Sequence, residues 1–133
     1  MSTKEYLEYE AAQSVRRIPF DSAKVVTGIV NGTYILIVSG ETACVNMKVR
    51  LSPLIYVRCP EYWGIEVIGE LDGCHCIIGI VPTPYTVSIQ LTGITGSEGV
   101  EVLGANQSKR FEVAGGCRST ASFDAAESST TRS

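Results

Sequence analysis

Apolar and polar residues alternate with a period of two through the middle of this chain, and no helical period occurs there. The segments Met47 to Leu51, Thr86 to Leu91 and Val100 to Val102 carry the pattern most clearly. Because successive side chains of a strand point to opposite faces, this pattern is typical of strands with one buried and one solvated face. The chain is therefore predicted to be all-β.

Short stretches of turn residues separate the candidate strands, and no helical segment lies between them. Parallel crossover connections are therefore not expected. The prediction is an antiparallel β-sandwich of about eight strands, immunoglobulin-like or jelly-roll-like, with no residue pattern specific enough to name a family. The candidate strands are residues 24–30, 33–39, 46–52, 54–58, 64–71, 74–81, 86–92, 99–104 and 109–113.

The length of 133 residues, of which 44% are hydrophobic, fits one domain with terminal extensions. Residues 1–19 form an N-terminal segment, predicted as a short helix or an extended stretch, because Ser2 and Glu5 fit a capping box. Residues 20–113 form the predicted sandwich. Residues 114–133 are dominated by Gly, Ser and Thr and are predicted to be a disordered, flexible tail.

Asn31-Gly32 lies between two apolar runs, which is a strong signal for a hairpin with a two-residue turn. That turn would pair Val30 with Thr33 and leave both faces of the hairpin apolar. A sandwich buries only one of them, so the other needs cover from the N-terminal segment, a long loop or another subunit. One face is our candidate interface and carries Val25, Ile29, Tyr34, Leu36 and Val38.

Asp72-Gly73 gives the same signal for a second hairpin, which would pair Glu70 with His75 and Leu71 with Cys74. Cys74 and Cys76 then join the core face. Glu70 and His75 lie on the opposite face. A carboxylate that orients an imidazole is part of general-base chemistry, but no nucleophile is expected beside this pair. We interpret it as a solvated cross-strand pair.

The chain has five cysteines, and its first residues show no secretory signal, so we expect a cytoplasmic protein with reduced thiols. Cys74-His75-Cys76 has the residue types of a metal site. On a strand, however, the two thiols point one way and the imidazole the other. We therefore predict no metal, no cofactor and no catalytic residue, and we keep an enzymatic or metal site around Glu70, His75 and the thiols as an alternative.

The open ends of the second hairpin would bring together Tyr62, Trp63 and Tyr85 on loops that contain proline. Rigid aromatic loops on a β scaffold can form a recognition surface, so we predict a ligand-binding rim with Arg58 and Glu61 as polar neighbours. The competing interpretation is that Trp63, the only tryptophan, fills the end of the core.

A net charge of -3 argues against a general nucleic-acid binder, whose affinity needs a basic surface. The apolar runs are too short to span a bilayer, so no membrane partner is expected. The predicted function is a non-enzymatic protein-interaction or self-assembly module, with another protein or a second copy as its partner. The alternative is a small-ligand or glycan-binding domain that uses the aromatic rim.

Overall fold

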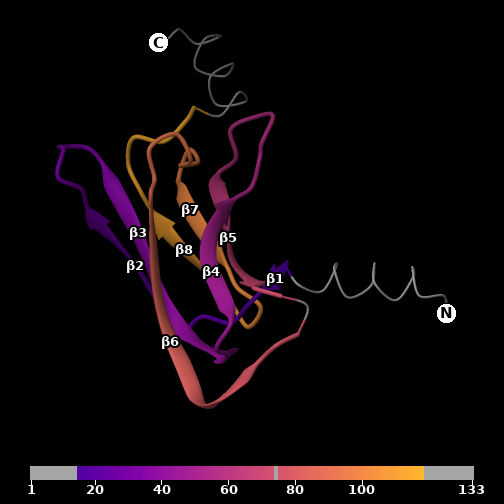
Figure 1. Cartoon of the computed structure of the whole chain (residues 1–133). Coiled ribbons are helices and arrows are strands. Elements are labelled where there is room, and N and C mark those ends of the chain that lie inside the picture. The colour runs from indigo at the N-terminus through magenta and orange to yellow at the C-terminus, as the bar shows by residue number, and fades with distance from the viewer. Residues whose placement is uncertain (1–14, 74, 119–133) are drawn as a thin grey trace, which may run out of the picture.

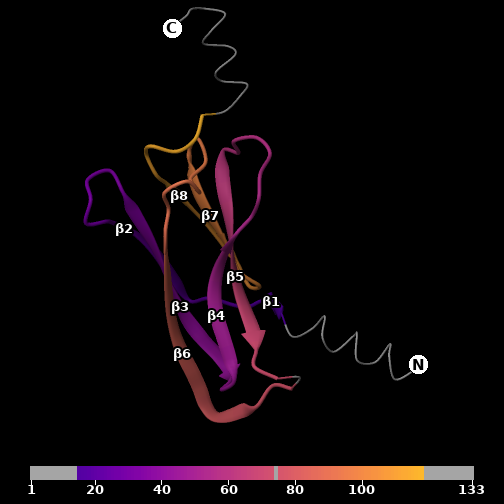
Figure 2. The same cartoon turned by 45° about the horizontal axis from the view of Figure 1, so that its top comes forward.

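A computed structural model describes residues 15–73 and 75–118, which fold into eight strands in two facing sheets (Figures 1 and 2). One sheet has the order β2-β3-β6, and the other is built around β5, which pairs with β1, β4 and β7, while β8 pairs with β7. The strands are β1 (Val15–Arg17), β2 (Ser22–Thr27), β3 (Tyr34–Cys44), β4 (Met47–Pro53), β5 (Tyr62–Leu71), β6 (Ile78–Gln90), β7 (Gly99–Leu103) and β8 (Ser108–Glu112).

The predicted all-β sandwich of about eight strands is confirmed, with one correction to its topology. The β5–β7 pair is parallel, with Tyr62 opposite Gly99, whereas only antiparallel pairs were expected. The connection is made by β6, which lies in the other sheet and takes the place that a helix fills in most parallel crossovers. Two further boundaries differ: residues 54–58 form a loop, and the predicted strands 74–81 and 86–92 belong largely to the single long strand β6.

The first hairpin forms, but its predicted register is wrong by two residues. Thr27, not Val30, begins the ladder and lies opposite Tyr34. The loop is longer because the Gly28 amide donates to the carbonyl of Thr33 (2.8 Å) and the Thr33 amide donates to Val30 (3.2 Å). Gly32 has a φ of 82°, which favours glycine in this turn.

The second hairpin does not form, and the predicted pairing of Glu70 with His75 is wrong. Glu70 lies opposite Lys48 of β4 and Val15 of β1, while β6 pairs with β3 in the other sheet. Gly73 has a φ of 115°, so the chain does turn there. The turn carries the chain out of one sheet and into the other.

The core lies between the sheets and is formed by aliphatic side chains from both, together with Phe20. Asn106 fixes Phe20 from both sides, because its Oδ1 accepts from the Phe20 amide (3.2 Å) and its Nδ2 donates to the Phe20 carbonyl (3.1 Å). The fully buried large side chains are Phe20, Leu36, Val38, Ile65, Val67, Leu91, Val100 and Val102.

Two disulfides, Cys44–Cys76 and Cys59–Cys117, replace the reduced thiols predicted at these four positions. Their partners are distant in the sequence, and the predicted hairpin had wrongly placed Cys76 on a core face with Cys74. Within the region predicted to be a tail, Cys117 is fixed to the sandwich, because its amide also donates to the carbonyl of Thr95 (3.0 Å). The predicted N-terminal helix, Cys74 and residues 119–133 lie outside the described residues.

Candidate interaction surface

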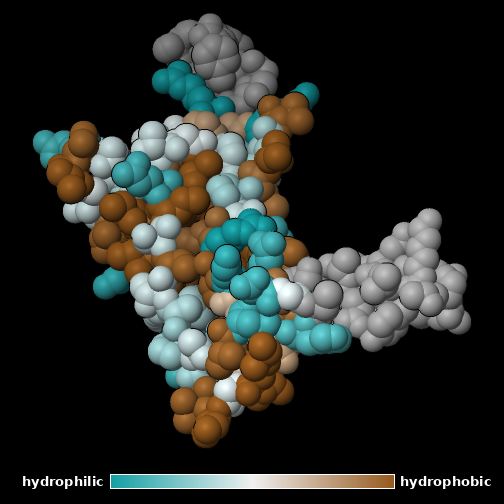
Figure 3. All heavy atoms as spheres, viewed as in Figure 1, coloured by the Kyte–Doolittle hydropathy of each residue, from teal (hydrophilic) through white to brown (hydrophobic). Residues whose placement is uncertain are grey.

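Five aliphatic side chains are exposed together at the end of the sandwich where β3 ends and β6 begins. Their relative exposures range from 51% at Val45 to 104% at Ile80. Figure 3 shows hydrophobic atoms gathered at this lower end of the molecule. We call this surface the end patch and define it by Val45, Ile77, Ile78, Ile80 and Val81. Single exposed aliphatic residues are ordinary, but a group of them marks a candidate contact surface.

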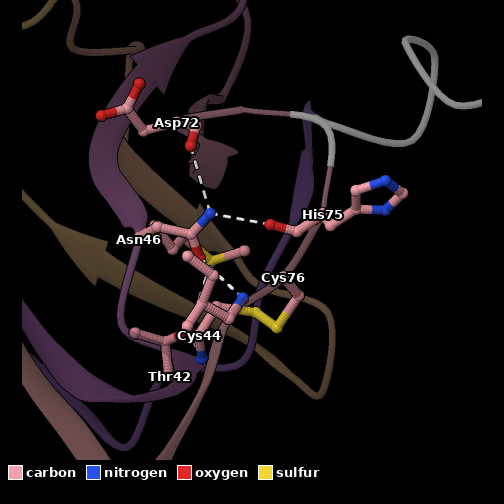
Figure 4. Close-up of a disulfide and its surroundings, with 8 residues drawn as sticks. Thr42, Cys44, Asn46, Asp72, His75 and Cys76 are labelled. Carbon is pink, nitrogen blue, oxygen red and sulfur yellow. Dashed lines mark hydrogen bonds between the residues drawn. A yellow bond between two sulfur atoms is a disulfide. The ribbon is translucent and has the colours of Figure 1, made fainter.

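The side chain of Asn46 holds the segment that precedes β6 (Figure 4). Its Nδ2 donates to the carbonyls of Asp72 (3.2 Å) and His75 (2.8 Å), and its Oδ1 accepts from the amide of Ile77 (2.9 Å). The amide of Val45 also donates to the Ile77 carbonyl (2.8 Å). One asparagine therefore satisfies backbone groups on both sides of the turn, which fixes Ile77 beside Val45.

The Cys44–Cys76 disulfide fastens the same segment covalently to the end of β3 (Figure 4). Cys44 is only 3% exposed, and its amide donates a hydrogen bond to the hydroxyl oxygen of Thr42 (3.2 Å). A surface that is already held in one conformation loses less entropy when a partner binds. The disulfide and Asn46 therefore give the end patch a fixed shape.

The end patch stays outside the core because the regular ladder between β3 and β6 is interrupted there. The register shifts between Thr42 and Cys44, and Ile78 is the β6 residue opposite Cys44. From Thr83 onward, β6 alternates between half-buried and exposed positions, but Ile78, Ile80 and Val81 are all exposed. These side chains therefore extend beyond the sandwich instead of packing inside it.

The aromatic rim predicted from the second hairpin is not assembled. Trp63 is half-buried and packs against the core, its ring meets Tyr56 edge-on at 5.0 Å, and its Nε1 donates to the Leu54 carbonyl (2.9 Å). The guanidinium of Arg110 lies over the ring of Tyr62 at 4.7 Å. These contacts favour the interpretation that Trp63 fills the end of the core.

Tyr85 belongs to the other sheet, where it pairs with Gly40. Its hydroxyl donates to the carbonyl of Pro19 (2.7 Å), and burial, with a smaller effect from the negative charge of Asp21, raises the pKa of Tyr85 to about 12. Arg58 and Glu61 are exposed. The ligand-binding role of the five rim residues stays a prediction.

The candidate interface on the first hairpin coincides mostly with the core face. Leu36 and Val38 are completely buried, and Val25 and Tyr34 pack against the same core. The predicted register differs from the observed one by two residues, and a shift of two keeps each side chain on the same face. These side chains therefore do share a face, but it is the face that the sandwich buries. Ile29 alone is fully exposed, since it lies in the loop between β2 and β3.

The proposed chemistry around Glu70, His75 and the thiols loses its geometric basis. The carboxylate of Glu70 lies 3.7 Å from the guanidinium of Arg50, and the His75 imidazole points away from the disulfide (Figure 4). Cys76 is bonded to Cys44 and is not a thiolate ligand. Within residues 15–73 and 75–118, no group of three or more His, Cys, Asp or Glu side chains is placed to hold a metal ion.

The sequence did contain a signal for the end patch. Residues 76–81 are one of the longest uninterrupted apolar runs in the chain. The hairpin register predicted from Asp72-Gly73 conceals this signal, because it places Cys76, the first residue of the run, on a core face.

No protein-family model matches this chain, and neither a curated protein nor a solved structure matches it. Among the described residues, none form a helix with the length and hydrophobicity needed to cross a membrane.

Proposed function

We propose that this protein is a non-enzymatic interaction module that binds another protein chain through the end patch. The observation that carries the proposal is the fixed cluster of exposed aliphatic side chains: Val45 beside Ile77, with Ile78, Ile80 and Val81 following on β6. Apolar side chains on a rigid frame favour protein contacts, because their burial releases water at little conformational cost.

The two disulfides bear on where this module works. Structural disulfides persist in oxidising compartments and are rare in the cytosol. We propose that the protein acts outside the reducing cytoplasm, in place of the cytoplasmic location expected from the sequence. The support for this proposal is the pairing of Cys44 with Cys76 and of Cys59 with Cys117.

A displayed library of random peptides tests the proposed contact surface. We expect selection on the folded, disulfide-bonded chain to enrich peptides with apolar anchors that bind it but not the double variant Ile78→Asn/Ile80→Asn. A matched control is Ile55→Asn/Val57→Asn, which removes two aliphatic residues of similar exposure from the loop between β4 and β5. Binding should survive in the control. Enriched peptides that bind all three proteins equally, or no enrichment at all, would overturn the proposal.

A further inference from the structure

The outer edge of β6 has no paired strand in the part of the chain that the structure describes. β6 is the last strand of the sheet β2-β3-β6, and Gln90 lies opposite Ile35. The amide of Leu91 donates to the Tyr34 carbonyl (2.9 Å), so Leu91 faces β3. Because backbone groups alternate between the two edges of an antiparallel strand, Thr86, Ser88 and Gln90 direct their N–H and C=O groups to the outer edge.

This edge lacks the charges that usually prevent strands from pairing with other molecules. The sequence contains no Asp, Glu, Lys or Arg between His75 and Glu98. Pro84 lies opposite Glu41, at a position whose backbone also faces outward, and it has no N–H to donate. Proline protects that half of the edge. The stretch from Thr86 to Gln90 is left open and uncharged.

The inner face of the sandwich is also incompletely covered along this stretch. Val87 and Ile89 point inward and are only half-buried, while their partners on β3, Val38 and Leu36, are completely buried. Another strand beside β6 would cover the exposed part of these side chains. An extended strand beside β6 would therefore both bond its outward backbone groups and cover its half-buried apolar side chains.

We propose that this partner is a second copy of the chain, which pairs antiparallel with β6 so that the two Ser88 residues face each other. In this register, Thr86 lies opposite Gln90 of the second copy, and each of the three outward residues donates one hydrogen bond and accepts one. Val87 lies opposite Ile89 of the second copy, and no charges meet. The sequence is therefore complementary to itself about Ser88.

The inference goes beyond the proposed function, because it uses a second surface, the outer edge of β6, and names the partner that binds there. Three residues of the end patch lie at the start of β6, away from the paired stretch around Ser88. Pairing through β6 would therefore leave one end patch exposed on each side of the dimer. An edge strand from a different protein is the competing occupant.

Substitutions at Ser88 test the register directly. The Ser88 side chain is exposed and its amide does not take part in the ladder with β3, so we expect the variants to fold. Sedimentation velocity of the full chain should show a reversible dimer, which Ser88→Ala retains. Ser88→Lys and Ser88→Glu should each weaken dimerisation about tenfold, because like charges would face each other. An equimolar mixture of the two charged variants should restore the dimer.

The remaining outcomes separate this inference from the proposed function. A wild-type chain that stays monomeric at several hundred micromolar overturns the inference, and so does a dimer that both charged variants keep unchanged. If such a dimer is lost in Ile78→Asn/Ile80→Asn, the contact is through the end patch, and the proposed function stands alone. Selected peptides whose binding is lost in Ser88→Pro would assign the edge to a foreign strand and also overturn the inference.

Discussion

The hydroxyl of Tyr85 donates a hydrogen bond of 2.7 Å to the carbonyl oxygen of Pro19. This bond joins β6 to the segment between β1 and β2. The ring can approach because Gly40, its neighbour on β3, has no side chain: a Cβ atom there would lie 2.7 Å from the tyrosine oxygen. A phenol buried in this way resists ionisation, which is why the pKa of Tyr85 is raised to about 12.

Replacing the hydroxyl should change both stability and its dependence on pH. We expect Tyr85→Phe to lower the free energy of unfolding by about 1 kcal/mol near neutral pH, because the Pro19 carbonyl loses its donor. The wild-type phenol keeps its proton to a higher pH when folded than when unfolded. Its contribution is therefore complete below about pH 10 and is lost as the pH rises through the folded pKa of about 12.

Urea unfolding near pH 7 and near pH 11 measures this effect, with Tyr62→Phe as a control that keeps Tyr85. The alkaline loss of stability should be smaller in Tyr85→Phe than in either the wild type or the control. An equal alkaline loss in all three proteins would contradict the assignment of the raised pKa to Tyr85.

Removing the side chain of Asn46 should loosen the segment that presents the end patch. We expect Asn46→Ala to cost about 1–3 kcal/mol, since the amide of Ile77 loses its acceptor and two carbonyls lose their donor. Hydrogen exchange should accelerate at the Ile77 amide. The amide of Val100, in the core, should be unaffected at conditions where the variant remains folded. Unchanged protection at Ile77 would show that Asn46 does not hold this segment.

Mass spectrometry can count the free thiols. Four of the five cysteines are in disulfides, which leaves Cys74, so iodoacetamide should add one label to the denatured, unreduced protein. Prior reduction should raise the number to five. The double variant Cys59→Ser/Cys117→Ser should be about 2–4 kcal/mol less stable, because this disulfide closes a loop with a sequence separation of 58. Five labels without reduction would support the original expectation of reduced thiols.

The fluorescence of Trp63 reports whether its indole ring is shielded from solvent at the end of the core. We expect emission at shorter wavelength and weaker acrylamide quenching in the folded chain than in the unfolded chain, since Trp63 packs against the core and against Tyr56. Tyr56→Ala should increase the quenching. Emission like that of tryptophan in water from the folded chain would revive the aromatic rim as a binding site.

The strands and their faces could be predicted because both depend on local periodicity. The alternation over Met47 to Leu51 lies on β4, and that over Thr86 to Leu91 lies mostly on β6. Even the wrong register at Asn31-Gly32 kept Leu36 and Val38 on one face, because a shift of two residues preserves the side to which a side chain points. The face that the sandwich buries depends on the second sheet, and a hairpin pattern contains no information about it.

The end patch could not be predicted because it depends on pairing between distant segments. Asp72-Gly73 indicates a turn, but a turn does not decide whether the next strand returns beside Leu71 or crosses to the other sheet. The partner of Cys76 is equally undetermined, since five cysteines allow many pairings. In the structure, Cys76 is bonded to Cys44, and the apolar run that follows it is exposed at the surface.

The parallel pairing of β5 with β7 has a consequence for how the chain reaches its native state. Tyr62 cannot pair with Gly99 until the whole of β6 has been synthesised, because β6 lies between the two residues in the sequence. Contacts between such distant segments form slowly, because a long loop must close before they stabilise anything. During translation, residues 62–66 of β5 therefore lack their partner on this side until β7 has been synthesised, and a chaperone that shields them would have its greatest effect in that interval.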